Sequence, residues 1–268
     1  MTLWELFRVL WVGYPAPPEM MDPAFPVFFQ RIGGLSLTLV ITVMSLGIGF
    51  PLGCLLALCR REAGEGGRRS FVGRLVSRGI RSAASGFVEV VRGLPIMLLV
   101  LLVFHLPYRV AQWRAPGIIL AVTAFSFYAG AYFAEVIRSG FRAVPQGLIG
   151  SGQVLGLRPM QIFMKIELPL ALRAMLPDFI NLAVTVFKDT STLAVVAVAE
   201  LTYTGRQLLM SQPLNYGLVL LLVLFLYWAP ACLVSSMLVP RCDGGVKFRN
   251  FLGWRMLSRN RVKASANV

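Results

Sequence analysis

Residues 144–172 read VPQGLIGSGQVLGLRPMQIFMKIELPLAL, and they separate two long apolar runs near the middle of the chain. Pro145 and Pro169 bracket the stretch, and proline interrupts helices because it lacks a backbone N–H and clashes with the preceding turn. Small residues occupy the first half, at Gly147, Gly150, Ser151, Gly152 and Gly156. An amphipathic set follows at Leu157, Ile162, Phe163 and Ile166. The stretch therefore predicts one or two short helices, displayed on one side of a membrane for a partner protein to grip.

The chain around this stretch has the composition of an integral membrane protein. Its 268 residues are 57% hydrophobic and only 14% charged, and the mean hydropathy is +0.71. These values lie outside the range of soluble globular proteins. A membrane-spanning helix needs about 20 apolar residues, so roughly four to six spans fit in the chain.

Apolar runs predict five spans, over residues 33–58, 87–106, 116–137, 177–198 and 216–239. The predicted fold class is therefore all-α transmembrane. We divide the chain into an N-terminal interfacial segment (1–32), a transmembrane domain (33–240) and a basic tail (241–268). The short helices of the opening stretch fall at about 147–165, within the transmembrane domain. Residues 60–84 are rich in Arg, Gly and Ser and are predicted to form a loop.

The formal net charge is +14, which raises the question of nucleic-acid binding. The basic residues, however, cluster in the gaps between apolar runs, as the positive-inside rule predicts. The 60–84 and 138–165 gaps and the tail hold 18 of them, against five in the N-terminal segment and the other two gaps. This asymmetry places the N-terminus outside, and the C-terminus and the opening stretch in the cytoplasm. The 60–84 gap could also bind anionic lipid or an acidic protein, but we prefer the topological role and expect no nucleic acid.

Several kinds of site are missing from the sequence. It has no GxxxxGK[ST] phosphate loop, and the run Gly244–Lys247 is too short and lacks the hydroxyl. The four cysteines lack metal-ligand spacing, and a single histidine argues against a His-based metal site. The N-terminus shows no features of a cleaved signal peptide. No inverted pair of halves is visible, which weakens a secondary-transporter interpretation.

The opening stretch resembles the signature of permease subunits of bacterial ABC importers, in particular the polar amino-acid uptake family. That signature runs Glu-Ala-Ala, two residues, Leu-Gly, six residues, Phe, then an apolar turn and Leu-Pro. Leu155-Gly156, Phe163 and Leu168-Pro169 fall at these spacings. Gly150-Ser151-Gly152 stands at the Glu-Ala-Ala position, so the small residues are kept and the acid is lost. In the family this is the coupling helix, which sits in a groove on the ATPase, and the missing Glu puts one polar contact there in question.

Four further motifs extend the resemblance over most of the chain. Residues 91–95 (VRGLP) resemble the family's Phe-Arg-Gly-Thr-Pro, and residues 130–138 (GAYFAEVIR) resemble its Gly-Ala-Tyr-x-Ala-Glu-Ile-x-Arg. Residues 144–147 (VPQG) resemble Val-Pro-x-Gly, and residues 187–191 (FKDTS) resemble the Phe-Lys-Asp-Thr-Ser that separates this family from most other ABC permeases. Five motifs in order make the resemblance specific. It is thinnest in the first 30 and the last 25 residues.

The resemblance implies a type I ABC importer permease in the bacterial inner membrane. Such a subunit translocates a polar L-amino acid delivered by an extracytoplasmic binding protein. It is not an enzyme and holds no cofactor, because ATP and magnesium belong to two partner ATPase subunits. A second permease, identical or homologous, completes the path through the bilayer. The residues expected to couple to the ATPase are Gly147, Gly150, Ser151, Gly152, Leu155, Gly156, Phe163, Leu168 and Pro169.

The pair Lys188-Asp189 interrupts the fourth apolar run. Charges at membrane depth are costly and are usually functional or paired. In the functional interpretation, Asp189 lies beside the translocation path with Lys188, Thr190 and Ser191, where polar groups could receive a zwitterionic amino acid. In the structural interpretation, Asp189 pairs with Lys188, or these charges pair with Arg92 or Glu135 on neighbouring helices. We weigh the structural interpretation somewhat above the functional one.

Two further pairs of charges stand three residues apart, which places each pair on one helical face. Glu135 with Arg138, and Glu89 with Arg92, are therefore predicted to be structural or gating ion pairs. The hydroxyls of Thr38 and Thr42 are also possible path residues. In a helix such hydroxyls more often bond back to their own backbone.

Two alternatives to an amino-acid importer stay open. One is an ABC permease for another small solute, such as an opine or a sulfur compound. The other, from a different class, is a homo-oligomeric channel or structural membrane subunit. A channel explains the hydropathy and the charge asymmetry but leaves the ordered motifs without a role.

Overall fold

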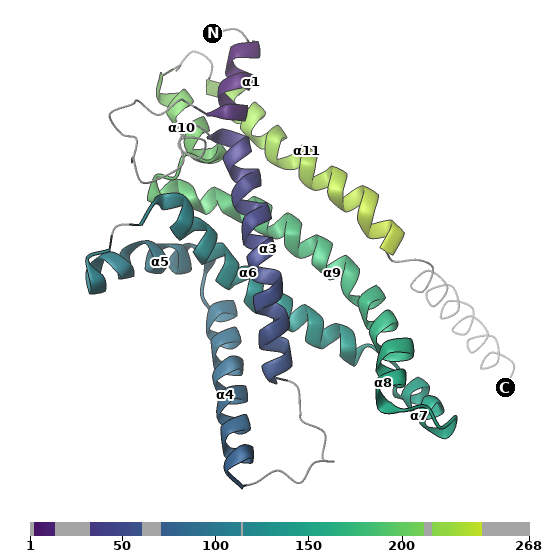
Figure 1. Ribbon diagram of the computed structural model, residues 1–268. Helices are drawn as coiled ribbons and strands as arrows, with labels where there is room; N and C mark the ends of the chain where they lie inside the picture. Colours follow the sequence, from purple (N-terminus) through teal and green to yellow (C-terminus); the bar gives the residue numbers. More distant parts are fainter. Residues whose placement is uncertain (1–2, 14–32, 61–70, 114, 212–215, 243–268) are drawn as a thin grey trace, which may run out of the picture.

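The computed structural model describes residues 3–13, 33–60, 71–113, 115–211 and 216–242. These ranges are helical almost throughout, as the sequence predicts (Figure 1). The long helices are α3 (Gly34–Arg60), α4 (Phe71–Gly93), α5 (Ile96–Ala111), α6 (Gly117–Arg142), α9 (Leu168–Asp189) and α11 (Tyr216–Cys242). The shorter elements are α1 (Leu3–Val12), α7 (Gln146–Val154), α8 (Pro159–Ile162), the π-helix η2 (Phe163–Glu167), the 3-10 helix η3 (Thr190–Val196) and α10 (Leu201–Ser211).

Four helical runs among the described residues are long and apolar enough to cross a membrane. They are Gly34–Arg60, Gly117–Arg142, Pro159–Val196 and Tyr216–Leu238, and the bent pair α4–α5 makes up to five. The first, third and fifth predicted spans are therefore confirmed. The predicted coupling region and N-terminal helix are also helical, whereas residues 14–32 and most of the basic tail lie outside the described residues.

The second predicted span differs from the structure. Helix α4 covers residues 71–93, so the predicted loop over 60–84 is wrong for residues 71–84; residues 61–70 lie outside the described residues. Helices α4 and α5 meet at an angle of 111° (Figure 1). The corner falls at Leu94-Pro95, because the residue before proline is driven out of the helical region and Pro95 then caps α5. An arginine-rich composition is typical of a loop, but here it belongs to a helix with an amphipathic sequence pattern.

The fourth span also starts earlier than predicted. Helices α8, η2, α9 and η3 form one continuous run of 38 residues from Pro159 to Val196. Pro169 therefore lies inside a helix and does not bracket the stretch. Its ring and missing N–H fall against the turn that contains Lys165, and that turn is the π-helix η2. A π-helical turn relieves such a clash by widening the backbone locally.

Helix α6 lies at the centre of the membrane domain and packs most extensively against α3. Glycine lets the two backbones approach: a Cβ on Gly53 would lie 2.4 Å from the Phe133 Cβ, and one on Gly49 would lie 2.8 Å from the Ala129 Cβ. Close approach through small residues is the usual basis of helix packing in membranes. The main buried cluster, which includes Ile41, is built around this contact.

A second buried cluster joins both ends of the described chain. Helix α1 inserts Leu6 and Leu10 against Leu35 of α3 and Leu201 of α10, and this cluster also includes residues of α11. Trp4 on the opposite face of α1 is 70% exposed. This amphipathic placement fits the predicted interfacial helix, because tryptophan favours the headgroup level of a bilayer.

Candidate functional site

A polar line runs along one face of α6, through the otherwise apolar membrane domain. It consists of Asp189, Tyr128, Tyr132, Arg92 and Glu135. The Tyr128 hydroxyl donates to Asp189 Oδ2 at 3.0 Å, and the Tyr128 and Tyr132 ring centroids lie 4.7 Å apart. The Arg92 guanidinium carbon lies 5.4 Å from the Tyr132 ring centroid, and its Nη1 is 3.4 Å from Glu135 Oε2. The line places a carboxylate at one end, a cation near the other and aromatic faces between them.

Asp189 is half-buried where α9 changes into η3. The described residues do not show the ion pairs that the structural interpretation of Asp189 predicts. Lys188 is exposed, and Asp189 accepts from Tyr128 instead of forming an ion pair with Lys188, Arg92 or Glu135. Adjacent residues on a helix point about 100° apart, so sequence neighbours cannot face each other.

The hydroxyls beside Asp189 stabilise the change of helix type. Thr190 is buried and donates to the Phe187 carbonyl at 2.7 Å. Thr192 donates to the Asp189 carbonyl at 2.8 Å. Ser191 is half-buried in the same turn. Thr190 therefore has a backbone partner, and Asp189 is the member of the predicted set whose side chain reaches a neighbouring helix.

Glu135 lies at the other end of the polar line, within a cluster of three arginines that we call the Glu135 cluster. Arg60 Nη1 lies 3.2 Å from Glu135 Oε2, Arg92 approaches the same oxygen, and Arg138 bonds to both carboxylate oxygens. The predicted contact between Glu135 and Arg138 is confirmed. The predicted pair of Glu89 with Arg92 is wrong for the described residues, because Arg92 turns to α6 while Glu89 is exposed.

Thr38 and Thr42 do not belong to the polar line. Thr38 Oγ1 donates to the Gly34 carbonyl at 3.2 Å and accepts from the Leu201 N–H at 3.2 Å, while Thr42 donates to the Thr38 carbonyl at 2.7 Å. Both side chains are buried. Their bonds tie α3 to itself and to the start of α10, which is the backbone-bonded role.

Glu200 is the residue that sequence reasoning missed. It is completely buried, and its carboxylate accepts from the backbone N–H groups of Thr202 and Tyr203 at 2.8 Å each. The Tyr227 hydroxyl of α11 donates to it at 2.7 Å. Glu200 thus caps α10 and holds it to α11, and burial raises its pKa to about 7 from the ordinary 4.5. The available signal was an acid directly before a short helix.

The predicted coupling stretch forms a hairpin of α7 and α8. Gly156 turns the chain with a φ of +72°, a left-handed conformation that costs any other residue strain. Gly152 is buried, and a Cβ there would lie 3.0 Å from Ile166 Cδ1. Gly152 is therefore small because α7 packs on η2. By contrast, Gly147 and Gly150 have open space around them.

The hairpin and the following turn of η2 carry several exposed apolar side chains. They are Leu148, Val154, Leu155, Met160 and Met164, of which Val154 is 90% and Leu155 78% exposed. Ser151 donates to the Gly147 carbonyl at 2.8 Å, and Phe163 stacks on Phe141 with ring centroids 6.0 Å apart. Leu168 and Pro169 start α9. Exposed apolar side chains grouped in one short segment favour an interaction site.

Known proteins were compared with the chain. The family described as "Binding-protein-dependent transport system inner membrane component" matches residues 70–247. The glutamine transport system permease protein GlnP of Escherichia coli is 34% identical over 70% of this chain and 78% of its own length. The L-cystine transport system permease protein TcyB of Bacillus subtilis is 28% identical over 84% of this chain and 90% of its own length.

Solved structures show the same fold. A crystal structure of an amino acid ABC transporter with histidines matches 78% of this chain and 91% of its own, with a TM-score of 0.69 and 24% identity. An inward-facing MetNI methionine ABC transporter matches 77% of this chain and 93% of its own, with a TM-score of 0.55 and 21% identity. Both place the helices described above in a fold that is known from transporters.

Proposed function

The chain belongs to the family of inner-membrane components of binding-protein-dependent transport systems, and from this premise we propose that it is the permease subunit of an ATP-driven importer for a polar L-amino acid. The relative named for glutamine supports this substrate class. The observation that carries the proposal is the polar line inside an apolar helical domain, because polar groups at membrane depth usually mark a substrate path.

The polar line suits a zwitterion. A carboxylate such as Asp189 binds an ammonium group, and a guanidinium such as Arg92 binds a carboxylate, in charge-assisted hydrogen bonds. The rings of Tyr128 and Tyr132 lie between these charges, and aromatic faces attract ammonium groups. An amino acid passing along this face of α6 exchanges water for these groups. Asp189 is held by a single neutral donor, so one of its oxygens is available to a ligand.

The hairpin of α7 and α8 is the proposed coupling element. Its exposed apolar side chains and the open space at Gly147 and Gly150 suit close docking into a groove on an ATPase subunit. ATP and magnesium bind in that partner and supply the free energy of hydrolysis. The hairpin is continuous through η2 with α9, which carries Asp189. Movement at the hairpin therefore reaches the polar line through one helical run.

The assembly that we propose has two permeases, two ATPases and one binding protein. The count of basic residues favours a hairpin and a C-terminus in the cytoplasm, with the N-terminus outside. The permease partner is either a second copy or a homologous chain. The missing acid at Gly150 removes one polar contact to the ATPase and leaves the exposed apolar side chains to carry docking.

One observation favours a second class of substrate, the sulfur compounds. One relative is named for L-cystine, a sulfur compound, so a sulfur-containing amino acid is the second candidate substrate. Thermal-shift measurements on the cognate binding protein with single amino acids separate these candidates. Stabilisation by a polar amino acid such as glutamine supports the proposal, whereas stabilisation only by a non-amino-acid solute contradicts it.

Transport itself is tested in proteoliposomes that contain the assembled complex and internal ATP. We expect Asp189→Asn to lower the initial rate of uptake far more than the yield of assembled complex. The matched control is Thr185→Ala, one helical turn earlier on α9, where the hydroxyl is exposed and bonds to its own backbone. Uptake that does not depend on ATP would refute ATP-driven import. Equal losses of uptake and assembly in Asp189→Asn would refute the proposed path.

A further inference from the structure

A pocket of about 330 Å³ opens between α3, α6 and η2, next to the Glu135 cluster. This volume lies at the lower end of the range of ligand pockets, about 300–1,000 Å³. Its walls are mainly apolar, with Cys54 and Ala57 from α3, Ile137 from α6 and Phe163 from η2. The polar line does not include any of these four residues. The pocket shares Arg60 and Arg138 with the Glu135 cluster, and it lies on the side of the membrane domain where the α7–α8 hairpin lies.

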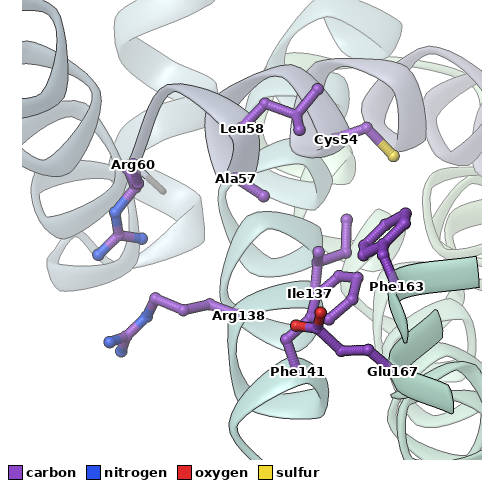
Figure 2. A pocket seen from close by; sticks show the side chains of 9 residues that line it. All are labelled: Cys54, Ala57, Leu58, Arg60, Ile137, Arg138, Phe141, Phe163 and Glu167. Atoms are coloured by element: carbon purple, nitrogen blue, oxygen red, sulfur yellow. The ribbon is translucent and has the colours of Figure 1, made fainter. Parts of the chain in front are cut away.

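The two guanidinium groups and most of the apolar side chains occupy different sides of the pocket, and the Glu167 carboxylate lies among the apolar side chains, near Ile137 and Phe141 (Figure 2). In Figure 2 the guanidinium groups of Arg60 and Arg138 extend to one side, whereas Cys54, Ile137 and Phe163 lie on the other. Arg60 is held in place by Ser85 Oγ at 3.3 Å as well as by Glu135. A ligand that fills this space meets two fixed cations and an apolar wall.

The cations near the pocket outnumber their carboxylate. Three guanidinium groups, from Arg60, Arg92 and Arg138, share the single carboxylate of Glu135, so the cluster keeps an excess of positive charge. Glu167 also lines the pocket, so three guanidinium groups stand against two carboxylates and one positive charge remains in excess. Guanidinium groups bind phosphate oxygens in paired hydrogen bonds. The excess therefore favours an anionic ligand with phosphate-like oxygens.

We propose that this pocket binds one anionic phospholipid, with the phosphate at Arg60 and Arg138 and one acyl chain along the apolar wall. Basic pockets between membrane helices are known to bind anionic headgroups. A zwitterionic lipid leaves the positive excess uncompensated, and a soluble anion leaves the apolar wall unused. The acyl chain contributes little binding free energy, because it moves from the hydrocarbon of the bilayer to an apolar wall of similar polarity. The arginines therefore decide the selectivity.

The bound lipid joins α3 and α6 to η2, the turn that links the hairpin to α9. It thus stabilises the base of the hairpin from the membrane side. This inference goes beyond the proposed function and does not depend on it, because it needs only the membrane location of the chain. Failure of transport in the experiment above leaves lipid binding untouched, and the reverse also holds.

The experiment uses the full-length chain with its co-purifying subunits in nanodiscs. A phosphatidylglycerol with a photoreactive group in its acyl chain is cross-linked, and the labelled peptides are identified by mass spectrometry. We expect labelling of residues 54–58, 137–141 or 163–167. Unlabelled phosphatidylglycerol should compete about tenfold better than phosphatidylcholine, because both lipids carry the phosphate but only phosphatidylcholine also carries a quaternary ammonium, which the arginines repel.

Two variants address the two sides of the pocket. Arg138→Gln removes a cation, and Ala57→Phe fills the apolar side while leaving every member of the Glu135 cluster in place. Both should lower the specific labelling by about tenfold. The matched controls are Arg142→Gln, an exposed arginine one turn further along α6, and Leu55→Phe, an exposed position on α3 that does not line the pocket. Neither control should change the labelling.

Four results would overturn the inference. Equal competition by phosphatidylcholine means that the lipid is unselective. Competition by inorganic phosphate at the same molar ratio means that the ligand is a free anion. Unchanged labelling in Ala57→Phe means that lipid does not occupy the pocket. Cross-links from the pocket to a peptide of another subunit mean the same. Size-exclusion profiles show whether each variant still assembles, and Ala57→Phe gives the decision if Arg138→Gln does not.

Discussion

Glu135 and Glu200 both point their carboxylates into the protein, but the partners of the two carboxylates differ in charge. Glu135 lies at one end of α6 among three arginines, and its side chain is 20% exposed. Glu200 is completely buried and has only neutral partners: two backbone N–H groups and the Tyr227 hydroxyl. Glu135 is surrounded by opposite charges, whereas Glu200 relies on hydrogen bonds against the cost of burial. Glu135 should therefore matter through its charge and Glu200 through its geometry and pH.

The largest effect is expected from Glu135→Gln. It leaves three guanidinium groups facing one another, and for the mostly buried pair of Glu135 with Arg60, whose side chains are 20% and 10% exposed, the loss of one partner costs about 3 kcal/mol. The midpoint of thermal unfolding in detergent should fall strongly. Glu89→Gln is the matched control, because Glu89 is exposed on α4 and makes no ion pair with Arg92. Equal midpoints for the two variants would show that the Glu135 cluster is not a structural centre.

The pH dependence of wild-type stability comes next. Below pH 4.5 Glu200 is protonated in both the folded and the unfolded chain, and above about pH 7 it is ionised in both. Between these values only the folded form keeps the proton, so the free energy of unfolding falls as the pH rises. The loss is about 3 kcal/mol across the window. The unfolding midpoint, measured from pH 4.5 to 7.5, should decrease, and a contribution that rises with pH would contradict the assignment.

Glu200→Gln tests the same site with a smaller expected effect. The amide keeps one acceptor oxygen but replaces the other with a donor, which faces a backbone N–H or the Tyr227 hydroxyl. The loss of one cap hydrogen bond costs about 1 kcal/mol near neutral pH. The variant should also lose the pH dependence that wild type shows between pH 4.5 and 7. If that dependence persists in Glu200→Gln, another group is responsible for it.

The smallest effect on stability is expected from Arg92→Gln. The Arg92 side chain is 39% exposed, and two arginines still surround Glu135 without it. Exposed ion pairs contribute about 1 kcal/mol or less. Uptake should nevertheless fall, because Arg92 is the proposed partner of the substrate carboxylate. Initial rates and unfolding midpoints measured on the same preparation separate the two roles, and normal uptake would remove Arg92 from the path.

The spans were predictable because burial in a bilayer needs long apolar runs, and such runs are visible in any single sequence. The first, third and fifth spans required no knowledge of contacts. The second span failed where α4 carries arginines along an amphipathic helix, since the charge count was taken as a loop signal. Pro95 lies within the second predicted span, but a sequence does not give the angle at which two helices meet.

The sequence predicts which residues belong to the site better than it predicts the residues they contact on other helices. Asp189 and Glu135 were singled out from motifs and from the cost of buried charge, and the contact of Glu135 with Arg138 follows from helical spacing. Partners that come from other helices were not visible: Tyr128 for Asp189 and Arg60 for Glu135. The functional role of these residues stays a prediction. Glu200 was missed because its burial depends on α1, α3 and α11 closing around the start of α10.

The run from Pro159 to Val196 acts as a lever. It spans about 45 Å between Pro159 and Asp189 at 1.5 Å per residue, and no described break interrupts it. A tilt of about 5° at the hairpin therefore displaces the far end by about 4 Å, more than the length of a hydrogen bond. A run that tilts as one unit needs only a small angular stroke at the hairpin to make or break the contact between Asp189 and Tyr128.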